Sequence, residues 1–255
     1  MERAVSITIV SAAMMFISAG LHGHEAVAGV PQSQIKPIPR PVLKLRWLFG
    51  ITLDKTTTIG GSVNGDITGT IVLLRSAINN LTVTLTTEGC LVDGAGNPVA
   101  TLPPTVTIPA GSDRVTFRIR TFYRPNINSS ITCTVRARYG EETETAGFVV
   151  EPLRVVSLTI LPATGFGPFT ATATITLNAR PAVTQTVTLT SSNPVVRFGP
   201  VDSAQPNVSL AFTNSSSHRT VQVVAGSVAQ QTVVTVSATL GALSQTRQMT
   251  VRSAP

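Results

Sequence analysis

The sequence has few of the residues that enzymes and helical proteins use most. Aromatic residues make up 5% of its 255 residues and charged residues 12%, and there are three histidines and two cysteines. No stretch of useful length repeats apolar residues at the helical spacing of three and four, so almost no helix is expected. Thr, Val, Ala and Ser dominate instead, and β-branched residues of this kind favour strands.

Motifs for known catalytic chemistry are also missing. The sequence contains neither G-x-S-x-G nor H-E-x-x-H, and its two cysteines lie apart from any cluster of histidines that could complete a zinc site. Glu141, Glu142 and Glu144 form an acidic cluster, but its place in a predicted hairpin turn favours solvated side chains over paired catalytic carboxylates. We therefore expect a protein that is not an enzyme and needs no cofactor. An enzyme with an unfamiliar site is the alternative.

The first 28 residues indicate export. Glu2 and Arg3 are charged, residues 4–21 are apolar apart from Ser, Thr and Gly, and Ala26-Val27-Ala28 has the A-x-A form of a cleavage site. This is the pattern of a secretory signal peptide. It predicts a secreted protein, extracellular or periplasmic, with no stable membrane span after cleavage. An uncleaved membrane anchor is the alternative, since the apolar stretch approaches spanning length.

Charge is distributed unevenly along the rest of the chain. The proline-rich segment 29–49 carries four basic residues and no acid, which predicts an extended basic linker. Residues 50–153 are close to neutral, whereas residues 155–255 carry five arginines and Asp202 as their one acid. A basic exported protein can associate with anionic envelope polysaccharide or with another surface protein. Alternatively, the arginines keep sheet surfaces soluble. Nucleic acid is not expected, because aromatic residues are not interleaved with the basic ones.

An internal repeat predicts the architecture. Residues 70–86 (TIVLLRSAINNLTVTLT) align without a gap with residues 174–190 (TITLNARPAVTQTVTLT), at an offset of 104. Apolar and polar residues alternate over short stretches such as 131–139, and turn-forming residues separate these stretches. About seven strands in about 100 residues are typical of an immunoglobulin-like sandwich. We therefore predict an all-β protein of two tandem antiparallel sandwiches, at 50–152 and 154–255.

The first repeat resembles a known family. Residues 61–73 (GSVNGDITGTIVL), 104–111 (PTVTIPAG) and 137–140 (ARYG) are similar to motifs of the bacterial immunoglobulin-like repeats found on secreted and surface proteins. The second repeat matches less well, because residues 207–214 (NVSLAFTN) lack the P-A-G turn. The resemblance implies an adhesive, surface or spacer role, and it brings no binding residues with it.

The two cysteines predict one disulfide bond, as is usual for a cysteine pair in an exported chain. In the predicted fold, the strand that ends before Cys90 and the strand that contains Cys133 are antiparallel neighbours in one sheet, which brings the two side chains together. Two separate buried thiols are the alternative, because the second repeat has Pro194 and Val234 at the matching places.

Four arginines are candidate ligand contacts. Arg118 and Arg120 point outward from one predicted strand, and Arg136 and Arg138 point outward from another that belongs to the opposite sheet. Two small basic rows are therefore expected, and simple solvated sheet faces are the alternative.

Metal binding is not expected. Residues 93–97 (DGAGN) place oxygen ligands close together, but they supply too few carboxylates for a calcium loop and contain ordinary turn formers. His218 is expected in an exposed loop.

The leading hypothesis is therefore an exported, non-catalytic binding or structural module of the cell exterior, adhesin-like or acting as a spacer. The alternative is an accessory subunit that docks on a larger exported enzyme or surface assembly.

Overall fold

The structure, a computed structural model, describes residues 47–90 and 96–255. The predicted signal peptide, the linker up to residue 46 and the segment 91–95 lie outside the described residues. All of the strands that the structure describes lie within one compact unit, residues 44–255.

Within residues 47–90 and 96–255, the regular structure consists of strands, apart from one short 3-10 turn at Val201–Ser203. The nine strands of the first sandwich are β1 (Leu48–Leu53), β2 (Thr57–Ile59), β3 (Ile67–Leu73), β4 (Leu81–Glu88), β5 (Ala100–Thr101), β6 (Thr105–Ile108), β7 (Arg114–Thr121), β8 (Ile131–Tyr139) and β9 (Glu142–Glu151). The nine strands of the second are β10 (Val155–Leu161), β11 (Thr164–Phe166), β12 (Phe169–Leu177), β13 (Gln185–Ser191), β14 (Val196–Phe198), β15 (Asn207–Phe212), β16 (His218–Ala225), β17 (Thr232–Leu240) and β18 (Leu243–Arg252).

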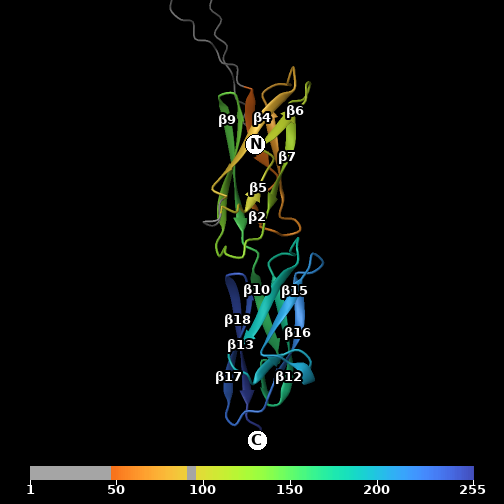
Figure 1. Cartoon of the computed structure of the whole chain (residues 1–255), viewed down its shortest axis with the longest axis vertical. Coiled ribbons are helices and arrows are strands. Elements are labelled where there is room, and N and C mark those ends of the chain that lie inside the picture. Colours follow the sequence, from red (N-terminus) through yellow and green to blue (C-terminus); the bar gives the residue numbers. More distant parts are fainter. Residues whose placement is uncertain (1–46, 91–95) are drawn as a thin grey trace, which may run out of the picture. The chain divides into compact units, whose positions relative to one another are not determined.

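Each sandwich pairs a four-stranded sheet with a five-stranded sheet. The orders are β1-β3-β7-β5 and β2-β9-β8-β4-β6 in the first sandwich, and β10-β12-β16-β14 and β11-β18-β17-β13-β15 in the second. Every strand of the second sandwich takes the place of its counterpart in the first, so the sequence repeat is also a repeat of topology. Figure 1 shows the two sets of strands, coloured orange to green and then green to blue. The predicted fold class of two tandem β-sandwiches is confirmed.

Among the residues that the structure describes, each sandwich has nine strands where about seven were expected, for two reasons. The first strand is divided between the sheets, because β1 pairs with β3 whereas β2 pairs in parallel with β9. The connection that follows β4 also touches both sheets, through β5 beside β7 and through β6 beside β4. Strands of two or three residues are too short to show an alternating pattern in the sequence.

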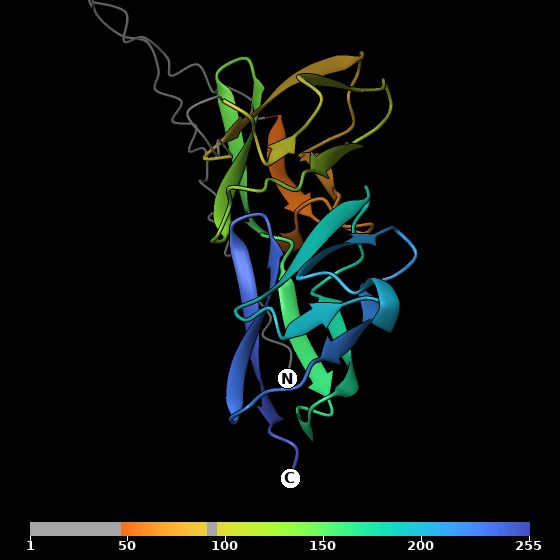
Figure 2. The ribbon, with the colours of Figure 1, turned by 60° about the horizontal axis from the view of Figure 1, so that its bottom comes forward.

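Alternate residues of each strand face a hydrophobic core between the two sheets. In β8 the side chains of Cys133, Val135 and Ala137 are buried, whereas Arg136 and Arg138 are exposed. The counterparts of the three buried residues in β17 are buried as well: Val234, Val236 and Ala238. Each sandwich has its own cluster of buried side chains. The turned view separates the hairpin of β17 and β18, in blue, from the opposite sheet (Figure 2). Burial of this apolar area stabilises each sandwich by about 25 cal/mol per Å².

The two cores pack one equivalent position differently. Gly69 in β3 lies opposite Phe117 in β7 and beneath its ring, where an added Cβ would overlap the aromatic carbons. In the second sandwich, Ala173 in β12 lies opposite Val221 in β16. A larger residue on one strand is therefore matched by a smaller residue on the other, as close packing requires.

The first strand begins at a carboxylate that belongs to a distant hairpin. The backbone N–H groups of Trp47 and Leu48 both donate to the carboxylate of Glu142, with the shorter distances at 2.8 Å. Arg75 stacks on the Trp47 ring, with its guanidinium carbon 4.2 Å from the ring centroid. As a result, β1 begins at Leu48, two residues before the expected start of the sandwich.

Candidate functional site

The four candidate arginines lie on the two sheets of the first sandwich. Arg118 and Arg120 are exposed on β7, in the four-stranded sheet, and Arg136 and Arg138 are exposed on β8, in the five-stranded sheet. The structure therefore separates them into two pairs.

On the five-stranded sheet, cross-strand register combines arginines with threonines. Arg138 lies between Thr84 of β4 and Thr143 of β9. One step along the face, Arg136 lies between Thr86 of β4 and Thr145 of β9. Directly opposed residues of neighbouring strands share a face, so two rows of hydroxyl and guanidinium groups run side by side. We call this surface the β4–β8–β9 face.

A groove of about 510 Å³ lies on the β4–β8–β9 face. Its lining residues are Thr84, Thr86, Glu88, Arg136, Arg138, Glu141 and Thr143. The lining supplies hydrogen-bond donors and acceptors but no aromatic side chain. Sequence reasoning found the two arginines and missed the threonines, although the T-x-T-x-T pattern of residues 82–86 marks alternate outward positions.

The arginines of the groove are held by weak, exposed contacts. Arg136 forms an ion pair with Glu88 at 3.0 Å, and the two side chains are 46% and 52% exposed. Arg138 donates from Nε to the Gly140 carbonyl oxygen at 2.8 Å. Ion pairs at this exposure contribute about 0–1 kcal/mol, so a ligand carboxylate can replace them at little cost.

The arginines of β7 have different surroundings. Arg118 pairs with Asp66, which immediately precedes β3 of the same sheet. Arg120, near the end of the strand, lines a separate cleft of about 330 Å³ together with Phe122 and Tyr123. Arg114, at the start of β7, donates to its neighbour Asp113, and this hydrogen bond holds the pKa of the carboxyl below its ordinary value of 3.8.

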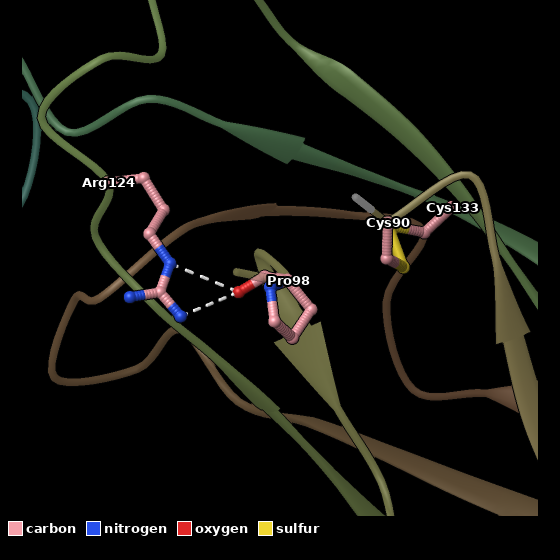
Figure 3. The surroundings of a disulfide bond; sticks show 4 residues. All are labelled: Cys90, Pro98, Arg124 and Cys133. Carbon is pink, nitrogen blue, oxygen red and sulfur yellow. Dashed lines mark hydrogen bonds between the residues drawn. A yellow bond between two sulfur atoms is a disulfide. The ribbon is translucent and has the colours of Figure 1, made fainter. Parts of the chain in front are cut away.

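Cys90 and Cys133 form the predicted disulfide bond. Their Cα atoms are 4.9 Å apart, within the range that a disulfide bridges without backbone movement. Close by, the Arg124 guanidinium donates from Nε and Nη2 to the Pro98 carbonyl oxygen, at 3.1 and 2.8 Å (Figure 3). The disulfide and this contact fix the chain on either side of the segment 91–95.

The other candidate groups form no cluster that the structure describes. Most of the possible calcium loop, residues 93–95, lies outside the described residues. Within 47–90 and 96–255, no group of three or more His, Cys, Asp or Glu side chains could hold a metal ion. His218 is exposed, at the first position of β16 rather than in a loop. Across the same residues, no helix has the length and apolar character needed to cross a membrane.

Glu142 has a structural role that sequence reasoning missed. It was expected to be a solvated residue of a hairpin turn, whereas its carboxylate accepts hydrogen bonds from the N-terminal end of β1. Trp47 and Glu142 are 95 residues apart in the chain, so no local sequence pattern predicts this contact.

No protein-family model matches the chain, and the search of curated proteins gave no match. Among solved structures, the chain is similar to CBD12 from CALX1.2, with 11% identity, a TM-score of 0.33 and coverage of 74% of this chain and 79% of that one. It is similar to the calcium binding domain CBD12 of CALX1.1, with 12% identity, a TM-score of 0.35 and coverage of 80% and 82%. It is also similar to the structure of manganese lipoxygenase of Gaeumannomyces graminis with part of zonadhesin of Komagataella pastoris. The identity there is 12%, the TM-score is 0.31, and the match covers 81% of this chain and 94% of that one. Likeness at this level identifies no ligand and no activity for this chain.

Proposed function

We propose that the protein is an exported, non-catalytic binding module that holds an acidic polysaccharide of the cell exterior on the β4–β8–β9 face. The observation that carries the proposal is the pair of cross-strand rows in which Arg136 and Arg138 each lie between two threonines. Export is supported by the A-x-A pattern at residues 26–28 and by the disulfide bond. Kinship with bacterial immunoglobulin-like surface repeats is part of the same proposal and is supported by the motifs in residues 61–73 and 104–111.

The chemistry of the face suits an extended polymer with hydroxyl and carboxylate groups. Threonine hydroxyls donate and accept hydrogen bonds, and a guanidinium can hold a carboxylate through two parallel bonds. Neighbouring strands are about 4.8 Å apart, and alternate residues of one strand about 6.7 Å apart, so these groups repeat at short intervals over the sheet. The ligand's carboxylate takes the place of Glu88 on Arg136.

The test is the affinity of the full chain for polygalacturonate, with neutral dextran as the control polymer. We expect the double substitution Arg136→Gln/Arg138→Gln to weaken binding of polygalacturonate at least tenfold, because it removes both cations of the groove. A rise in ionic strength from 0.05 to 0.5 M should also weaken the binding of polygalacturonate to the wild-type protein, since salt screens exposed charges.

A matched control removes two exposed arginines elsewhere. Arg114→Gln/Arg247→Gln changes the net charge by the same amount, on the opposite sheet and on the second sandwich. This variant should bind like the wild type. Equal losses in both double variants would mean that total charge rather than the β4–β8–β9 face attracts the polymer, and the proposal would then be wrong.

A further inference from the structure

Arg120 stands beside a cleft that has apolar walls. The cleft measures about 330 Å³, and its walls include Phe122, Tyr123 and Val183. Val183 is 72% exposed although its side chain is apolar. Ligand sites in proteins are concave, mostly apolar and about 300–1,000 Å³ in volume. This cleft, which we call the Arg120 cleft, lies at the lower end of that range and suits a ligand with a single ring.

Backbone hydrogen bonds hold the walls of the Arg120 cleft in place. The N–H of Val63 donates to the Arg180 carbonyl at 2.9 Å, and the N–H of Ala182 donates to the Gly61 carbonyl at 2.8 Å. Gly61 has a φ of +70°, and a side chain at this position would overlap Tyr123. The glycine therefore allows the close approach that builds this wall. Walls held in this way need little rearrangement when a ligand enters, which favours affinity.

Two of the three charged side chains in the Arg120 cleft already have partners. Asp66 pairs with Arg118, which compensates the one negative charge near a bound anion. Arg124 donates two hydrogen bonds to the Pro98 carbonyl oxygen. The Asp66 carboxylate and the Arg124 guanidinium therefore both contact other groups of the first sandwich.

The third charged side chain, Arg120, is exposed and has no hydrogen-bond or ion-pair partner among the described residues. We propose that the Arg120 cleft binds a small carboxylate carried on an apolar ring. The guanidinium holds the carboxylate through two parallel N–H···O bonds. The ring lies against Phe122, Tyr123 and Val183, where it removes apolar surface from water.

Tyr123 contributes a partly buried aromatic side chain to the wall of the Arg120 cleft. Burial raises the pKa of its phenol above the ordinary value of 10.0. An uncharged ring fits such a wall better than the hydroxylated ring of a sugar acid, whose polar groups would lose water without gaining partners.

The test is binding of three probes to the full chain by calorimetry or ligand-observed NMR. Benzoate carries the carboxylate on an apolar ring, benzamide keeps the shape without the charge, and glucuronate keeps the charge on a polar ring. We expect benzoate to bind at least tenfold more tightly than either of the others. Equal affinity for benzoate and benzamide, equal affinity for benzoate and glucuronate, or no benzoate binding at millimolar concentration would overturn the proposal.

Substitutions in the Arg120 cleft test which side chains contact the ligand. Arg120→Gln should weaken benzoate binding at least tenfold and leave benzamide unaffected, whereas Val183→Ser should weaken both several-fold. Arg136→Gln/Arg138→Gln should bind benzoate like the wild type, so this proposal and the proposed polysaccharide function can fail independently. Arg120 is exposed, and an unchanged melting temperature for Arg120→Gln will show that the variant is folded. Unchanged benzoate binding in that folded variant would contradict the assignment.

Discussion

The pKa of the Tyr123 phenol depends on how deeply its side chain is buried. Its ring is partly buried and packs against the hydrophobic core of the second sandwich, although the residue follows β7 of the first. Burial disfavours the charged phenolate and so raises the pKa of this group.

The sign of the resulting pH dependence follows from linkage. Above pH 10.0 the unfolded chain loses the Tyr123 proton, while the folded chain retains it until a higher pH. Unfolding then releases a proton, so the contribution of Tyr123 to stability is complete below pH 10 and declines as the pH rises above it. In the variant Tyr139→Phe, which leaves one tyrosine, absorbance at 295 nm should titrate at a higher pH in the native protein than in denaturant. Coincident curves would show that the phenol is not shielded.

At the scale of single elements, β3 and β7 depend on a match between Gly69 and Phe117. An added methyl group at Gly69 would overlap the Phe117 ring, and overpacking of this kind destabilises by about 1–3 kcal/mol. Gly69→Ala should therefore lower the free energy of unfolding by about that amount, as measured by denaturant titration.

The second sandwich suggests a rescue for this variant. It carries Ala173 opposite Val221 at the equivalent place, so Gly69→Ala combined with Phe117→Val reproduces a pair that already exists in the same topology. The double variant should recover part of the loss, although Phe117→Val alone should destabilise because it leaves a cavity. Strictly additive losses would show that the two residues do not pack as a pair.

Elements with a clear period were predictable from the sequence, and the surfaces between them were not. The alternation in residues 131–139 predicted β8 and its inward and outward faces. By contrast, β2 and β5 have three and two residues, too few for a period to show. The rows of the β4–β8–β9 face depend on which residue of β4 lies opposite Arg138, and register of this kind is decided by contacts between distant segments.

The Arg120 cleft illustrates the same limit. Arg120 was a candidate because it alternates with buried residues on its strand. Phe122 and Tyr123 follow the strand and belong to no pattern, and Val183 lies about 60 residues away in the sequence. Only folding brings these side chains around one cleft.

At the scale of the whole molecule, two hydrophobic cores carry the stability, and one of them contains a disulfide bond. Cys90 and Cys133 close a loop of 43 residues in the first core, whereas Val234 fills the place of Cys133 in the second. The chain-entropy argument gives the bond a contribution of about 4 kcal/mol, through restriction of the unfolded chain.

Reduction should therefore destabilise one sandwich more than the other. In calorimetric scans with and without reductant, we expect the transition of the first sandwich to move to lower temperature, while that of the second changes less. The variant Cys90→Ser/Cys133→Ser, scanned without reductant, should reproduce the shift. Superimposable scans in all three conditions would show that the bond does not restrict the unfolded chain.

The shared topology of the two sandwiches also creates a hazard during folding, because each strand has a counterpart that could take its place in a hybrid sheet. Misassembly between similar neighbouring domains is a characteristic failure of repeat proteins. The unequal packing at Gly69 and Ala173 opposes it. In a strand-exchanged sheet, Ala173 would meet the Phe117 ring and clash, while Gly69 would face Val221 across a void. The sequence differences between the repeats thus favour pairing of each strand with its neighbours in its own sandwich.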